Sequence, residues 1–232
     1  MTRLATFGDN VVDCYSGHGA MFAGGNALNV ACFARAAGAD AAYVGAVAED
    51  PAGRHIRAQL VQAGVDISHL RVVAGRTAFC VIGSRDGERE FLRADLGVSI
   101  IRPGPAELDF IASRDAVHTG RSSHVEADLP AMAARTRLSF DFALLRDPAR
   151  ISSIAPHCFL ASFSGGALAD AEVDALQAQA RGAGARWCLV TLGRRGAALF
   201  GPDGAVTVPA AGVQVVDTLG AGDAFIARAL VG

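Results

Sequence analysis

The sequence contains no run of basic residues, no C-x-x-C motif and no apolar run of membrane-spanning length. The formal net charge is −2, and the positive charge is carried by arginines scattered along the chain. Neither a nucleic acid nor an anionic membrane surface is therefore indicated as a partner. The amino-terminal stretch also lacks the layout of a signal peptide. We expect a cytoplasmic protein that acts on small molecules.

Groupings of metal ligands are also absent from the sequence. The six histidines include no pair at the helical spacing of a zinc site. The five cysteines lie far apart, and three of them stand in apolar runs (Cys32, Cys80 and Cys188). Such cysteines indicate buried thiols in a reducing compartment rather than a disulfide framework.

The composition and the first elements favour a single α/β domain over residues 1–232. The chain is 51% hydrophobic and contains 27 glycines, so it can form a sizeable core with many turns. Strand and helix patterns alternate at the spacing of βαβ units, which predicts a parallel sheet. We expect strands at 3–8 and 41–48, and helices at 26–38 and 51–64. Asn26 is the expected N-cap of the first helix, and Gly38 is expected to end it.

A short region of β-structure interrupts this alternation. Residues 77–94 are typical of a hairpin with its turn around Asp86-Gly87, and 15–25 could supply another strand of the same lid. The alternation then resumes up to a closing turn and helix. The remaining expected elements are strands at 115–120, 138–145, 157–162 and 186–193, helices at 126–136 and 169–182, and a hairpin across Gly201–Gly204.

The closing stretch "DTLGAGDAF" combines a glycine-rich turn with an acidic residue. Gly220, Ala221 and Gly222 would place free backbone N–H groups at the positive end of a helix dipole, which suits a phosphate. Asp223 would repel a resting phosphate, but it could act as a base toward an attacking hydroxyl. The alternative is an ordinary capped helix whose dipole Asp223 satisfies.

Three other stretches could contact a ligand, and each has a structural alternative. The loop "GDNVVD" presents carboxylate and amide groups that could bind sugar hydroxyls, or could bond their own backbone. The stretch "FAGGNALNV" allows close backbone approach, or forms a tight turn before a helix. The stretch "TLGRRG" could hold nucleotide phosphates or simply turn the chain. The ligand candidates in the first loop are Asp9, Asn10 and Asp13.

Taken in order, these stretches resemble the ribokinase, or pfkB-type, carbohydrate kinases. The resemblance runs from residue 3 to the end, through "GGNALN", "GVDISHL" and the specific "DTLGAGDAF". It implies a three-layer α/β sandwich with a mainly parallel sheet and a β-lid at about 15–22 and 72–92. It also implies a homodimer that pairs through the lid.

The resemblance assigns roles residue by residue. It implies ATP and Mg²⁺ as cofactors and leaves a monovalent cation open. Asp223 resembles the catalytic base, and Gly220, Ala221 and Gly222 resemble the anion hole. The sugar-binding positions correspond to Asp13, Gly24, Gly25 and Asn29, and the nucleotide contacts to Thr191, Gly193 and Gly196.

Within this family, "GDNVVDCY", "VHTG" and "SFDF" are most similar to fructoselysine kinases, which phosphorylate the 6-hydroxyl of a fructosamine. A first loop rich in carboxylates suits a substrate that carries an ammonium group. Two alternatives stay open: a kinase for another sugar or a nucleoside, and a truncated, non-catalytic sugar-binding module.

The sequence also departs from the family pattern. An Asn-x-x-Glu motif that helps to place magnesium has no counterpart in "ASFSGGALADAE", where Glu172 is out of spacing. Of a further Asp-x-Asn-x-Arg motif only Asp141 matches, so the magnesium ligands are left unassigned. Family members usually continue with several helices after the final signature. We therefore expect an uncovered apolar face and an adenine site that is incomplete unless a partner completes it.

Overall fold

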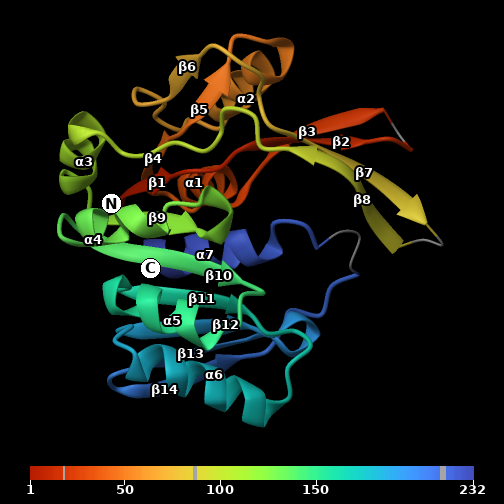
Figure 1. The fold of residues 1–232 in the computed structure, drawn as a ribbon. Helices are drawn as coiled ribbons and strands as arrows, with labels where there is room; N and C mark the ends of the chain where they lie inside the picture. The colour runs from red at the N-terminus through yellow and green to blue at the C-terminus, as the bar shows by residue number, and fades with distance from the viewer. Residues whose placement is uncertain (18, 86–87, 215–217) are drawn as a thin grey trace.

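An eight-stranded sheet forms the centre of the computed structural model, which describes residues 1–17, 19–85, 88–214 and 218–232 (Figure 1). The strand order is β14-β13-β12-β11-β10-β9-β1-β4. In this order, neighbouring strands from β4 to β12 are parallel, whereas β13 pairs antiparallel with β12 and β14 pairs antiparallel with β13. Their bounds are β1 Arg3–Phe7, β4 Asp40–Val44, β9 Ala116–Gly120, β10 Arg137–Ala143, β11 Leu160–Ser164, β12 Trp187–Thr191, β13 Ala197–Gly201 and β14 Gly204–Val208.

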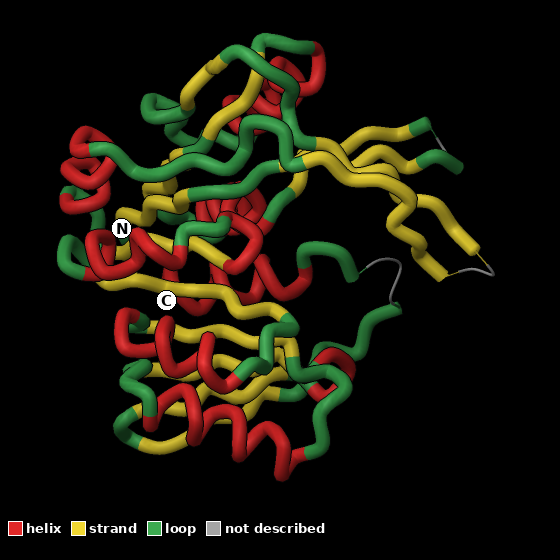
Figure 2. The backbone as a smooth tube through the Cα atoms, in the orientation of Figure 1, coloured by secondary structure: helices red, strands yellow, loops and turns green. Residues whose placement is uncertain are grey.

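Helices cover both faces of this sheet and give the three layers that the sequence predicts (Figure 2). One face carries α1 (Asn26–Ala36) and α7 (Ala221–Val231), which pack together around Val30 and Ile226. The opposite face has a core of stacked aromatic rings from β10 and β11 and the apolar sides of four helices. Those helices are α3 Pro105–Ala112, α4 Leu129–Ala133, α5 Pro148–Ile154 and α6 Asp170–Gly182.

A second sheet projects from one side of the molecule (Figure 1). Its order is β3-β2-β7-β8, with β7 and β8 forming the predicted hairpin. The bounds are β2 Val11–Tyr15, β3 Ala20–Gly24, β7 Phe79–Arg85 and β8 Glu88–Asp95. The predicted turn residues Asp86 and Gly87 lie outside the described residues. Asp13, which was predicted in a loop, lies in strand β2.

A third, two-stranded sheet corrects the prediction of one strand over 41–48. Strand β5 (Ala46–Ala48) leaves the main sheet after Gly45 and pairs with β6 (Arg71–Val73). A Cβ at Gly45 would lie 2.2 Å from the Tyr43 hydroxyl, so the chain can turn there only without a side chain. Residues 72 and 73 consequently belong to this pair and not to the predicted lid. Helix α2 (Pro51–Gln62) packs beside it and begins with proline, and the Asp50 carboxylate caps it by accepting from the N–H of Gly53.

Several boundaries differ from the predictions. The N-cap of α1 is Gly25, not Asn26. The helix predicted at 126–136 is a 3₁₀ turn followed by the short α4, and the strand predicted at 157–162 begins only at Leu160. Helices α3 and α5 were not among the predicted elements, although each begins with proline in its first turn.

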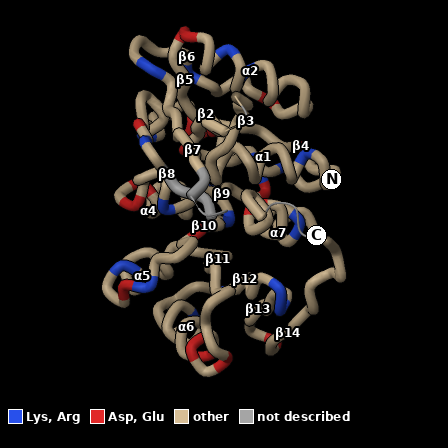
Figure 3. Tube along the Cα trace, turned by 90° about the vertical axis from the view of Figure 1, so that its right-hand side faces the viewer, with Lys and Arg blue, Asp and Glu red and all other residues tan. Residues whose placement is uncertain are grey.

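The surface carries basic and acidic residues interspersed along the elements, as Figure 3 shows. No helix in the described part of the chain has the length and apolarity needed to cross a membrane. Beside α7 lies an apolar groove of about 510 Å³, lined by Phe159, Trp187, Leu199 and Leu230 among others.

Candidate active site

The candidate site lies where the carboxyl ends of the parallel strands meet the amino terminus of α7. Open parallel sheets bind ligands at this edge, because strand ends and helix N-termini converge there. A cavity of about 350 Å³ opens at this point. Its lining combines strand ends and the glycine turn, and includes Asp141, Ser162, Ser164, Thr191, Gly220, Gly222 and Asp223.

The glycine turn shapes the start of α7. Gly220 is its N-cap, and its φ of 75° lies in the left-handed region that glycine adopts at little cost. The N–H of Ala221 donates to the carbonyl of Thr218 at 3.2 Å. The N–H of Gly222 donates to no acceptor among the described residues, so it is available to an anion in the cavity.

Asp223 stands in the first turn of α7 and is held by two asparagines of α1. The Nδ2 of Asn26 donates to one carboxylate oxygen and the Nδ2 of Asn29 to the other, each at 2.8 Å. Burial raises the pKa of Asp223, while these two hydrogen bonds favour the charged form and lower it. The carboxylate is therefore fixed in orientation and has the raised proton affinity that suits a base.

A second carboxylate, Asp141 at the end of β10, shares the amide of Asn26 at 3.2 Å. Its other oxygen accepts from the Ser162 hydroxyl at 3.1 Å and from the N–H of Ala143 at 3.0 Å. Ala143 has a φ of 49° at a bulge of β10, which turns its N–H back toward this carboxylate. Burial raises the pKa of Asp141 to about 6, opposed by the Ala143 hydrogen bond and reinforced by the charge of Asp223.

The first-loop residues divide into two groups. Asp9 is buried and accepts the N–H groups of Asn26 and Ala27 and the hydroxyl of Ser123, so it anchors the start of α1. Asn10 is also buried, and its Nδ2 donates to the Tyr43 hydroxyl and the Ala46 carbonyl. Both residues therefore have internal partners, and of the three predicted first-loop ligands only Asp13 is half-exposed.

The glycine pair permits close contacts between these segments. A Cβ at Gly24 would lie 2.4 Å from the Asp13 carboxylate, and one at Gly25 would lie 2.8 Å from the Cα of Asn10. Gly25 also has a φ of 104°, outside the range of other residues. The pair thus lets β3 turn into α1 directly beneath the Asp13 side chain.

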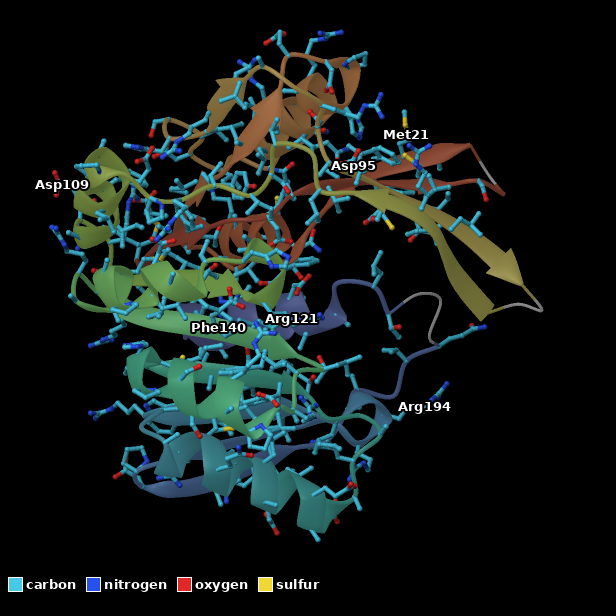
Figure 4. The ribbon with its side chains drawn as sticks, in the orientation of Figure 1. Met21, Asp95, Asp109, Arg121, Phe140 and Arg194 are labelled. Carbon is cyan, nitrogen blue, oxygen red and sulfur yellow. The ribbon has the colours of Figure 1, made fainter. Side chains whose placement is uncertain are left out.

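Of the predicted nucleotide contacts, Thr191 lines the cavity at the end of β12, while Gly193 and Gly196 flank the next turn. A Cβ at Gly196 would lie 1.9 Å from the Val208 carbonyl, so glycine is needed there for the β13–β14 hairpin. Arg194 points away from the strands, whereas Arg121 follows β9 near the middle of the view (Figure 4).

Several residues that the structure places here had no site role predicted from the sequence. Asn26 was predicted only as a cap and Asp141 only as a partial motif match, while His118 stood in the "VHTG" stretch of the family resemblance and Ser162 in a predicted strand. The one signal available for Asn26 was its i, i+3 spacing from Asn29, which puts both amides on one helix face.

The comparisons with known proteins agree with this geometry. The model of the pfkB family of carbohydrate kinases matches residues 4–232. The chain is 35% identical over 230 residues to fructosamine kinase FrlD of Bacillus subtilis, covering 97% of this chain and 81% of that protein. It is 35% identical over 246 residues to fructoselysine 6-kinase of Escherichia coli, covering 100% and 89%.

Solved structures share the fold. Arabidopsis thaliana ribokinase complexed with ribose and ATP superposes with a TM-score of 0.85 at 21% identity, covering 99% of this chain and 85% of that one. Aminoimidazole riboside kinase of Salmonella enterica superposes with a TM-score of 0.80 at 22% identity, covering 98% and 83%. The signature turn, the sandwich fold and these matches together show that the chain belongs to the pfkB family of carbohydrate kinases.

Proposed function

We propose that this chain transfers the γ-phosphoryl group of ATP to a primary hydroxyl of a small carbohydrate, the 6-hydroxyl of a fructosamine such as fructoselysine. The observation that supports this most is the Asp223 carboxylate, held by two amides at the amino terminus of α7 and facing the cavity. The substrate class follows from the two 35%-identical relatives that are named fructosamine and fructoselysine kinases.

In the proposed step the sugar oxygen attacks the γ-phosphorus, and the bond from that phosphorus to the bridging oxygen of ADP breaks. Asp223 takes the proton of the attacking hydroxyl, which contributes roughly 10²–10⁴-fold to the rate. The available N–H of Gly222 in the 220–222 turn would donate to the transferring group, and losing one such donor typically costs about 10²–10³-fold. The α7 dipole adds to the same stabilisation.

The residues present fit a magnesium ion that arrives with ATP. Mg²⁺ prefers oxygen ligands and is usually held by one or two carboxylates together with substrate phosphates and water. No group of three or more His, Cys, Asp or Glu residues in the described part of the chain could hold a metal alone. Asp141, with the hydroxyls of Ser162 and Ser164, would face the ion, which would neutralise phosphate charge.

The remaining parts of the proposal concern the surroundings of the site. The β3-β2-β7-β8 sheet would act as the lid, and Asp13 at its base would face the ammonium group of a fructosamine. Residues 1–232 would act as one unit, in the cytoplasm, where the five free cysteines would stay reduced.

An ATP-coupled assay with fructoselysine, fructose, ribose and a nucleoside tests the proposal. We expect turnover with fructoselysine, and a loss of about 10²–10⁴-fold in kcat for Asp223→Asn with sugar affinity retained. Asp109→Asn is the matched control, since this exposed carboxylate lies on α3 away from the site (Figure 4).

Three outcomes would count against parts of this proposal. Turnover only with another sugar or a nucleoside would correct the substrate. Sugar binding by calorimetry without any ATP affinity would favour a non-catalytic binding module. An unchanged kcat in Asp223→Asn would remove Asp223 from the role of base.

A further inference from the structure

His118 is a completely buried histidine in the middle of β9. It contacts the side-chain amide of Asn26, which in turn holds the Asp223 carboxylate. Its Nδ1 lies 2.9 Å from the Ser139 hydroxyl, and its Nε2 lies 3.1 Å from the Oδ1 of Asn26. Its register partners on the neighbouring strands are Thr6 and Ser139, and neither carries a charge. The ring does not line the cavity, so it can act on a substrate only through Asn26.

The chemistry of the partners fixes where the protons are. The Asp223 carboxylate can only accept, so the amide nitrogen of Asn26 must point to it and the amide oxygen must point to His118. That oxygen needs a donor, which places the imidazole proton on Nε2. Burial lowers the pKa of His118 to about 3, so the ring is neutral and its Nδ1 accepts from the Ser139 hydroxyl.

We propose that His118 is a positioning residue that sets the amide orientation of Asn26 and thereby the orientation of the Asp223 carboxylate. This inference rests on the proposed function, because orientation matters only if Asp223 accepts a proton. The chain of donors runs in one direction, from Ser139 to His118, to Asn26, and to Asp223.

Asn26 and Asn29 differ in how firmly they can hold the carboxylate. Asn26 is bonded at both ends of its amide, whereas the Oδ1 of Asn29 accepts no hydrogen bond among the described residues. Without the Nε2 proton, the Oδ1 of Asn26 loses its donor, and only the two carboxylates still oppose a flip of the amide. A flipped amide would turn its oxygen toward Asp141 and Asp223 and repel both carboxylates.

Two substitutions at His118 separate positioning from packing. His118→Leu replaces the ring with an apolar side chain of similar size that has no donor, and we expect kcat to fall roughly 10- to 100-fold, as for other residues that orient a reacting group. The KM values for sugar and ATP should stay near those of the wild type. His118→Gln can still donate to Asn26 and should recover most of the lost kcat.

The Asp223→Asn background provides a sharper test. If His118 acts through Asp223, adding His118→Leu to Asp223→Asn should cause no further loss of kcat. A full additional loss in the double variant, an unchanged kcat in folded His118→Leu, or equal loss in His118→Gln and His118→Leu would each overturn the proposal.

An NMR measurement tests the geometry even if no sugar is phosphorylated. In the ¹⁵N-histidine-labelled wild-type protein, His118 should show the neutral Nε2–H tautomer across the neutral pH range. An Nδ1–H tautomer would overturn the proposed donor chain, also when His118→Leu fails to fold. An absence of kinase activity together with the Nε2–H tautomer would reject the proposed function and leave the orientation of Asn26 intact.

Discussion

At the scale of single residues, the site places two carboxylates, the buried Asp141 and the half-buried Asp223, on one amide nitrogen. Asp141 and Asp223 both accept from the Nδ2 of Asn26, and burial is the main cause of the raised pKa at each. The charge of Asp223 raises the pKa of Asp141 further, and the charge of Asp9 raises the pKa of Asp223. Both carboxylates therefore retain a proton more readily than a surface carboxylate does. The hydrogen-bond partners that lower the pKa differ between the two.

This proton affinity makes stability depend on pH through Asp141. Its pKa rises from 3.8 to about 6, so the folded protein binds a proton that the unfolded chain has released. The stabilisation is complete below the ordinary carboxyl pKa and is lost as pH rises through about 6. We expect Asp141→Asn, which cannot ionise, to gain about 3 kcal/mol relative to the wild type between about pH 4 and pH 7.

Urea denaturation of both proteins across that range measures the difference. Comparing the two proteins at each pH cancels the contributions of other carboxyl groups, such as Asp115, whose pKa is lowered by Arg3. A difference that does not change with pH would show that Asp141 titrates as an ordinary carboxyl group.

At the scale of elements, the first turn of α7 combines a left-handed residue with an acidic helix start. Gly220 provides the left-handed conformation, and a Cβ there would meet only ordinary contacts with Phe33 and Asn29 at 3.5 and 3.6 Å. Gly222 is already helical, and a Cβ there would have open space. Of the two glycines of the signature, only Gly220 is thus required by its backbone conformation.

We expect Gly220→Ala and Gly222→Ala to change stability in opposite directions. An alanine forced into the left-handed region at 220 should lower the free energy of unfolding by about 1–2 kcal/mol. An alanine at 222 should raise it by up to about 1 kcal/mol, because alanine favours the helix. Chemical denaturation of both variants measures this, and equal effects would contradict the conformational account.

At the scale of the whole molecule, the second sheet exposes several large apolar side chains to solvent. Its exposed apolar side chains include Met21, Phe22 and Leu92, each more than half exposed. Met21 lies on the sheet that projects from the main body (Figure 4). Both edge strands, β3 and β8, also present unpaired backbone groups. These features favour association of the chain through this sheet.

We therefore predict a homodimer that depends on Phe22. Phe22→Arg should shift the molar mass measured by light scattering from dimer to monomer, since a buried unpaired charge opposes the interface. Val61→Arg on α2 is the matched control, because Val61 is 60% exposed and lies outside this sheet. A monomeric wild type, or an equal effect of both variants, would contradict the prediction.

The sequence by itself determined the alternation of strands and helices, the β7–β8 hairpin and the glycine-rich signature turn. These features depend on local rules: the spacing of apolar residues, the conformations that only glycine adopts, and turn residues next to each other in the chain. The turn of 220–222 and Asp223 could be recognised for the same reason, since all four positions are adjacent.

Only the tertiary structure decided which groups surround Asp223. Asn26 and Asp223 are 197 positions apart, and Asn26 and His118 are 92 apart. The exit of β5 from the main sheet likewise depends on Tyr43 filling the space over Gly45 and on pairing with the distant β6. Contacts between such distant residues leave no periodicity in the sequence, because the folded sheet brings them together and their spacing along the chain does not.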